Sequence, residues 1–291
     1  INGNMYAKSK INTSIEKSLG KLLAIQSKQL NSFMHSQAMR NFEWDPSNIR
    51  WVKKFLSLFN GLKKDVIIES IKQHELFVQK NKKNLKHSVT HGDPNDYNIV
   101  VKNEKIVGLI DFGDSIYAPS INDLAIALSY SLTQSQNLFD TLNNIVGSYN
   151  KICPINDDEI YSLFSLIKSR LVITLVMAAK QRKKYPDNRY LSISEKNAWL
   201  LIFKLNKIDP YFFIAVIRSI CNKEPISNFS QRLDLLKSQK FGNIFDFDLN
   251  DVNKKIVNFD KSSILLKSNP SNFRLNNLVK KFIKNDIGIG L

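Results

Sequence analysis

Residues 90–100 read THGDPNDYNIV, and residues 108–114 read GLIDFGD. Two short runs rich in β-branched residues, 99–101 and 106–110, flank a polar tetrapeptide, and this arrangement predicts a β-hairpin. The residue before the first strand and the residue after the second strand lie at the same end of such a hairpin. Neighbouring strands are about 4.8 Å apart, so side chains at that end can share a ligand.

The polar residues at that end are Asn98 and Asp111. A carbonyl and a carboxylate oxygen, with room left for water and phosphate oxygens, suit Mg²⁺ better than zinc. Asp93 lies on the loop that enters the hairpin, where it can accept a proton from an alcohol while the metal neutralises a triphosphate. These three residues predict phosphoryl transfer to a hydroxyl group.

The same residues resemble the aminoglycoside phosphotransferase family of protein-kinase-like enzymes. Asp93 and Asn98 have the D-x-x-x-x-N spacing, Asp111 opens a D-F-G motif, and His-Gly-Asp replaces the His-Arg-Asp of protein kinases. The Asp-Leu-Ala at 123–125 is similar to a helix start of the family, and the sequence at 95–98 is closest to its hydroxylysine-kinase-like branch. The resemblance implies an enzyme that uses ATP and Mg²⁺, with Asp93 as the catalytic residue and Asn98 and Asp111 as metal ligands.

Five further residues are candidates for supporting or substrate-binding roles. His91 is expected to bond the backbone near the catalytic loop rather than to carry a proton. Asp114 either assists the metal or caps the following segment, and the resemblance implies that Asp123 braces the catalytic loop. Arg170 and Arg182 could bind the carboxylate of an amino-acid substrate, although a structural ion pair is the favoured interpretation for both.

The resemblance implies a kinase that acts on a hydroxyl group of a small, amino-bearing metabolite, and it places hydroxylysine first. Homoserine, choline, ethanolamine and an aminoglycoside stay open, because specificity resides in helices whose sequence offers no readable code. An alternative from another class is a catalytically incomplete regulatory or docking module of a fused aminotransferase-like protein. In large bacterial proteins of this branch the kinase module precedes a peptidase-like segment and an aminotransferase-like module, so a fused downstream module is expected.

The resemblance covers residues 1–223, which we expect to form the catalytic, C-terminal lobe of a protein-kinase-like fold. The amino-terminal lobe of such enzymes, with its β-sheet and phosphate-covering loop, has no counterpart before the first predicted helix. We therefore expect a fragment that lacks most of that lobe. Residues 224–291 are expected to be a linker and the start of a following module, whose opening is 287–291.

The expected fold class is α+β, mostly helical, with a catalytic β-hairpin and a small C-terminal segment. Apolar residues recur at helical spacing over about 12–37, 48–59, 65–79, 120–132, 139–150, 157–182, 194–206 and 210–221. The longest purely apolar run, Leu171 to Ala179, is bracketed by basic residues and is far shorter than a membrane span. We therefore expect no association with a membrane.

The 291-residue chain carries 42 Lys and Arg against 26 Asp and Glu, which gives a formal net charge of +16. A basic surface attracts nucleic acid. Only eight of the basic residues are Arg, however, and the Lys are spread along the chain, so a solvated surface is favoured over a nucleic-acid site. The two cysteines lack partners at metal-ligand spacing, and no secretory signal is present, so we expect a cytoplasmic protein.

Overall fold

The structure is a computed structural model that describes residues 2–184, 192–226, 228–231, 255–259 and 262–266. The chain divides into two compact units, Ile1–Lys207 and Ile208–Leu291. All the predicted site residues lie in the first unit. The domain boundary that the sequence predicts near residue 224 stays a prediction.

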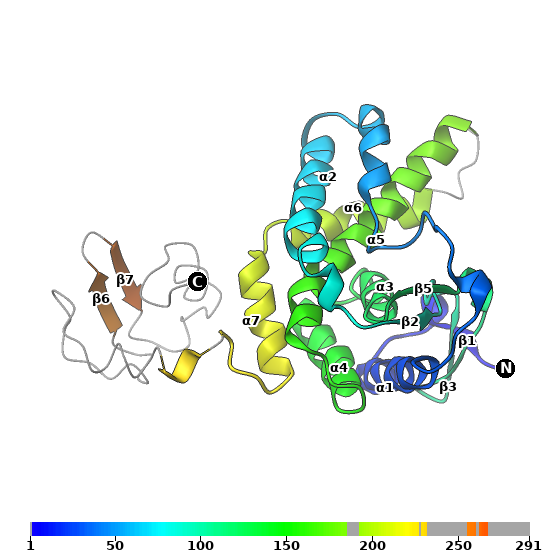
Figure 1. Cartoon of the computed structure of the whole chain (residues 1–291), viewed down its shortest axis with the longest axis horizontal. Coiled ribbons are helices and arrows are strands. Elements are labelled where there is room, and N and C mark those ends of the chain that lie inside the picture. Colours follow the sequence, from blue (N-terminus) through cyan, green and yellow to red (C-terminus); the bar gives the residue numbers. More distant parts are fainter. Residues whose placement is uncertain (1, 185–191, 227, 232–254, 260–261, 267–291) are drawn as a thin grey trace. The chain divides into compact units, whose positions relative to one another are not determined.

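Helices make up most of the described part of the first unit (Figure 1). They are α1 (Thr13–Leu30), α2 (Gly61–His74), α3 (Asn122–Ser131), α4 (Leu138–Asn150), α5 (Asp157–Lys184) and α6 (Ser192–Leu205). Helix α1 packs along α4, and α5 packs against α2, α3 and α6. The α+β class and most of the predicted helices are confirmed.

Two of the predicted helices differ from the structure. The first ends at Leu30 rather than near residue 37, because the chain beyond it has no apolar face to bury: Phe33 and Met34 are both about half exposed. The range 48–59 forms a 3₁₀ helix, Arg50–Leu58, instead of an α-helix. Only Val52 of that segment is buried, so tertiary packing does little to stabilise a regular α-helix there.

The predicted hairpin is confirmed. Strands β3 (Ile99–Lys102) and β4 (Lys105–Leu109) pair antiparallel. Asn103 and Glu104 form the connecting turn, and both have a positive φ (49° and 55°), as a two-residue type I′ turn requires. A short strand that the sequence did not predict, β1 (Asn4–Met5), pairs with β3 on its other side.

A second pair of strands frames the catalytic loop. Strand β2 (His87–Thr90) leads into that loop, and β5 (Ile116–Pro119) follows the D-F-G-D segment. The two strands pair antiparallel, so both ends of the motif-bearing segment are fixed to each other. This pairing joins residues about thirty positions apart, and no local pattern in the sequence predicts it.

Helix α5 lies in the centre of the first unit, where α2, α3 and α6 surround it (Figure 1). Its length and its mean hydropathy of 1.6 over an 18-residue window would let it cross a bilayer, but 89% of that window is buried inside the protein. Burial on all sides is what the core helix of a globular domain shows. The helix carries Arg170 into this core.

The described part of the second unit contains α7 (Pro210–Ile220) and a hairpin of β6 (Lys255–Phe259) and β7 (Ser262–Leu266). Asp209 caps α7 by accepting hydrogen bonds from the backbone N–H groups of its first turn. Helix α7 confirms the range predicted at 210–221. The predicted module opening at 287–291 lies outside the described residues.

Candidate active site

The catalytic loop runs from His91 to Asn98, between β2 and β3. Its second residue, Gly92, has a φ of 85°, which lies in the left-handed region. A Cβ atom at this position would lie 2.1 Å from the backbone oxygen of Asp114, so only glycine fits the close approach of the two segments. The loop is thereby held directly against the D-F-G-D segment.

Asp123, at the start of α3, holds the beginning of this loop. Its carboxylate accepts hydrogen bonds from the backbone N–H groups of His91 (2.8 Å) and Gly92 (3.0 Å) and from Nε2 of Gln26 (3.0 Å). Burial raises the pKa of this carboxyl, although the His91 imidazole and the two backbone donors oppose that effect. These contacts are the ones that a residue bracing the loop has to make.

His91 is fully buried and bonded at both ring nitrogens. Nε2 lies 3.0 Å from the backbone oxygen of Ile110, and Nδ1 lies 3.3 Å from the backbone nitrogen of Asp93. A neutral imidazole with its proton on Nε2 satisfies both contacts. His91 therefore ties the catalytic loop to the end of β4, as the structural interpretation of this residue requires.

Asp93 projects from the loop and is partly open to solvent, with 18% of its side chain exposed. Its Oδ1 accepts from Nη2 of Arg170 in a short ion pair, and its Oδ2 accepts from Nδ2 of Asn95 at 2.7 Å. Each carboxylate oxygen has two lone pairs, so one acceptor position on each stays available. The carboxylate is thus oriented from both sides and still able to accept a proton from a bound alcohol.

Arg170 reaches Asp93 from the centre of α5, 77 residues further along the chain. The guanidinium also donates to the hydroxyl of Tyr130 (3.1 Å) and to the backbone oxygen of Trp44 (3.3 Å), and its carbon lies 4.7 Å from the centroid of the Trp44 ring. Only 2% of its side chain is exposed. The planar fork suits several acceptors at once, which a lysine could not match.

The other predicted arginine lies in a different setting. Arg182 makes a two-pronged ion pair with Glu195 of α6, at 2.6 and 3.0 Å. Glu195 also accepts from the indole nitrogen of Trp199. Both candidate arginines are therefore in ion pairs, and binding of a substrate carboxylate by Arg170 or Arg182 stays a prediction.

The predicted metal ligands lie at the open end of the hairpin. Asn98 donates its amide nitrogen to the backbone oxygen of Asp93 (2.9 Å), an orientation that leaves its Oδ1 for a cation. The backbone oxygen of Asn98 accepts from the nitrogen of Ile110, which ties the two strand ends together. Asp111 has a φ of 66°, in the left-handed region, and its side chain is exposed.

This donor set fits a hard divalent cation. An amide oxygen and a carboxylate oxygen leave most coordination positions to phosphate and water, which is how proteins commonly hold Mg²⁺ on a nucleotide. Within the described residues no cluster of three or more His, Cys, Asp and Glu is placed to hold a metal.

Asp114 follows the D-F-G motif and is partly buried. Burial raises the pKa of its carboxyl, and the nearby carboxylates of Asp93 and Asp111 raise it further. Three carboxylates thus concentrate negative charge at one end of the site, which a divalent cation would relieve. Whether Asp114 assists the metal or caps the next segment stays open.

A cavity of about 230 Å³ adjoins the catalytic loop. Its walls include Asp96 from the loop, Tyr130 from α3, Gln134 just after the end of α3, and Thr174 from α5. No motif in the sequence assigns a role to Asp96, Tyr130 or Gln134. Asp96 stands inside the quoted motif, three positions after Asp93, and that spacing was the one signal that could have drawn attention to it.

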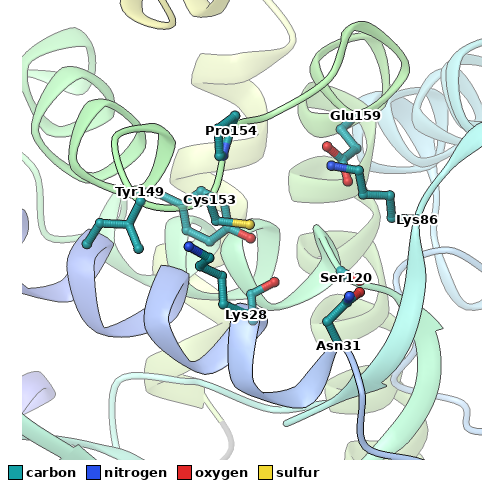
Figure 2. A pocket seen from close by; sticks show the side chains of 10 residues that line it. Lys28, Asn31, Lys86, Ser120, Tyr149, Cys153, Pro154 and Glu159 are labelled. Atoms are coloured by element: carbon teal, nitrogen blue, oxygen red, sulfur yellow. The ribbon is translucent and has the colours of Figure 1, made fainter.

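A larger cavity, of about 400 Å³, lies elsewhere in the first unit and contains none of the predicted site residues (Figure 2). Lys28 and Asn31 from α1, Lys86 before β2, and Cys153 and Glu159 from the region around the start of α5 are among its lining. Its size is not evidence of catalysis, because it lacks the aspartates and the asparagine that the chemistry requires. We therefore place the site at the catalytic loop.

The family model that matches this chain is that of the phosphotransferase enzyme family, over residues 15–147. That range holds Asp93, Asn98 and Asp111 together with Asp123. Residues 15–147 form a domain of the phosphotransferase enzyme family.

Proteins similar to this phosphotransferase domain include the hydroxylysine kinase of Mus musculus, 29% identical over 196 residues, which cover 62% of this chain and 52% of that protein. The hydroxylysine kinase of Xenopus laevis is 29% identical over 198 residues, with coverage of 62% and 53%. The chain thus spans about half the length of the curated relatives it matches.

Among solved structures, an amicoumacin kinase in complex with AMP-PNP and Ca²⁺ aligns with a TM-score of 0.50 at 13% identity, over 72% of this chain and 64% of that chain. At this identity the likeness shows the fold. The phosphotransferase domain therefore lies in a kinase-like fold, as the sequence predicted.

Proposed function

We propose that this chain carries the catalytic residues of an ATP- and Mg²⁺-dependent kinase that phosphorylates a hydroxyl group of a small, amino-bearing metabolite, with hydroxylysine as the first candidate. The observation that carries the proposal is the double orientation of Asp93 by Arg170 and Asn95, beside Asn98 at the end of the hairpin. The names of the relatives from mouse and Xenopus laevis support the substrate class. The AMP-PNP and Ca²⁺ bound by the amicoumacin kinase support the use of a nucleotide and a divalent cation.

In the proposed reaction Asp93 holds the substrate hydroxyl and receives its proton. The substrate oxygen forms a bond to the γ-phosphorus of ATP, the bond from that phosphorus to the β–γ bridging oxygen breaks, and ADP leaves. Asn98 and Asp111 would hold Mg²⁺, which supplies positive charge to the phosphates when bound. Such catalysis consists mainly of positioning and charge neutralisation, so a rigid carboxylate suffices.

Arg170 positions Asp93 rather than touching the reacting atoms in this scheme. Its guanidinium fixes one carboxylate oxygen, and Asn95 fixes the other, so the remaining lone pairs point in set directions. A hydroxyl bound there meets an acceptor that needs no reorganisation before proton transfer. The rigidity of α5 is thereby transmitted to the catalytic loop.

The test is ADP formation by the purified protein with ATP and Mg²⁺ on a panel of hydroxy amino acids and amino alcohols. The variant Asp93→Asn should lower turnover at least about a hundredfold, since general acid–base groups contribute a factor of this size. The control Asp140→Asn, which changes an exposed acid on α4, should leave turnover unchanged. Nucleotide binding without turnover on any panel member would contradict the kinase and favour the regulatory module.

A further inference from the structure

The cavity beside the catalytic loop carries a single charge. Among the described residues that line it, Asp96 is the one ionisable acid or base apart from two tyrosines, and the remaining polar groups are neutral, including Gln134, Thr133, Thr174 and Asn197. A ligand that enters this space therefore meets one carboxylate and several hydroxyl and amide groups. That pattern is complementary to a ligand with one positive charge and additional hydrogen-bonding groups.

Asp96 has no counter-ion in the described part of the chain. Its Oδ2 accepts from Nε2 of Gln134 at 3.1 Å, and no Lys, Arg or His lies within ion-pair distance of it in the described ranges. The side chain is half-buried. A carboxylate partly removed from water and held only by neutral donors, Gln134 and a backbone N–H, is incompletely compensated, and a cationic ligand would supply the missing partner.

The cavity is connected to Asp93 by a short chain of contacts. Tyr130 lines the cavity, and its hydroxyl accepts from the same Nη2 atom of Arg170 that donates to Asp93. Gln134, the donor to Asp96, lies one helical turn beyond Tyr130. The carboxylates of Asp93 and Asp96 belong to one loop, three positions apart, and the charge of Asp93 acts on the carboxyl of Asp96.

Neither Arg170 nor Arg182 is available to bind the carboxylate of a ligand in this cavity. Arg170 already serves Asp93, Tyr130 and the backbone of Trp44, and Arg182 is held by Glu195. Neither arginine lines the cavity. The described walls thus favour an amino group over an acidic group as the feature that is recognised.

We propose that Asp96 binds the ammonium group of the substrate and makes this site selective for small alcohols that carry a primary amine. This inference rests on the proposed kinase function and specifies which residue selects its substrate. A space of about 230 Å³ corresponds to roughly eight water volumes, below the range of about 300–1,000 Å³ usual for drug-sized ligands. The size suits a free amino alcohol or amino acid.

The test is calorimetric binding of matched ligands in the absence of nucleotide. 1-Amino-2-propanol and 5-hydroxylysine carry the amine, and 1,2-propanediol replaces the amine of the first by a neutral hydroxyl. Wild type should bind the amines at least about tenfold more tightly than the diol, which is the usual effect of a hydrogen bond to a charged group. Asp96→Asn should bind amine and diol with equal, weak affinity, and Asp65→Asn, which removes an exposed acid on α2, should behave as wild type.

Equal binding of amine and diol by wild type, or no binding of either, would overturn the assignment, as would full amine selectivity in Asp96→Asn. Thermal unfolding of Asp96→Asn shows whether the variant is folded, and retained binding of the diol gives a second check on the cavity. The two proposals fail separately. Selective binding of amines without ADP formation would contradict the kinase function and leave the ammonium site standing. ADP formation without selectivity for amines would contradict only the role of Asp96.

Discussion

The two sides of the candidate site are built differently. Around Asp93 the chain supplies buried support from distant segments: Arg170 from α5 and Asp123 from α3. At Asp111 the side chain is exposed, and the next residue, Phe112, is 49% exposed. The surroundings of Asp93 are therefore part of the core. Of the two predicted metal ligands, Asn98 is buried beside Asp93, whereas Asp111 lies at the surface, next to a segment that Arg40 holds by donating to the backbone oxygen of Gly113.

Changes around Asp93 should therefore alter folding stability together with function, whereas changes at the exposed Asp111 should alter function alone. The measurements below test that separation.

Replacing Arg170 by Met should have the largest effect. The substitution leaves Oδ1 of Asp93 without its partner and removes the contacts with Tyr130 and Trp44, so the free energy of unfolding should fall by about 3 kcal/mol. Chemical denaturation measures this loss. A double-mutant cycle with Asp93→Asn should show a coupling energy above about 1 kcal/mol, and additive losses would mean that the two side chains do not support each other.

Acidification should loosen the same side of the site through His74. Burial lowers the pKa of this histidine to about 4 from 6.5, and its ring contacts Ser169, the residue before Arg170, at 2.9 Å. Between pH 6.5 and 4 the unfolded chain binds a proton that the folded chain does not, so this group's contribution to stability should fall by roughly 3 kcal/mol as pH drops through that window.

Denaturation at a series of pH values measures this effect. His74→Gln lacks the titrating ring, so its stability should depend less on pH between 6.5 and 4 than that of wild type. Profiles of equal slope for the two proteins would show that another group controls acid unfolding.

Removal of the Asp123 carboxylate should have an intermediate effect. Asp123→Ala leaves the backbone N–H groups of His91 and Gly92 without an acceptor, which should lower the free energy of unfolding by about 2 kcal/mol. The loss is smaller than the number of bonds suggests, because burial of this charge is itself unfavourable. Asp65→Ala, which removes an exposed acid on α2, should change stability by less than about 0.5 kcal/mol in the same assay.

Much of the metal side could be predicted from the sequence, because its determinants are local. Two short runs rich in β-branched residues, 99–101 and 106–110, predict the hairpin, and the hairpin places Asn98 and Asp111 at one end. The two-residue turn sets the register beside it, but a bulge between Val100 and Val101 shifts the register before the strands reach the site, and no pattern in the sequence predicts that shift.

The base side could be predicted only in part. The motif indicates Asp93, but its pairing with Arg170 spans 77 residues and depends on how α5 packs in the core. The sequence marks Arg170 as a buried residue in need of a partner without saying which one. The link from Asp96 to Gln134 and the pairing of β2 with β5 are likewise products of tertiary packing.

In the proposed reaction Asp93 acts as the base and Asp111 holds the metal. Calorimetric titration with AMP-PNP in the presence of Mg²⁺ separates these two roles. Asp111→Asn should weaken binding at least about tenfold through loss of a charged ligand, while its stability changes by less than about 0.5 kcal/mol. Asp93→Asn should bind the nucleotide within about twofold of wild type, because binding of the phosphates does not require the base. Equal losses in both variants, or wild-type affinity in Asp111→Asn, would contradict the account.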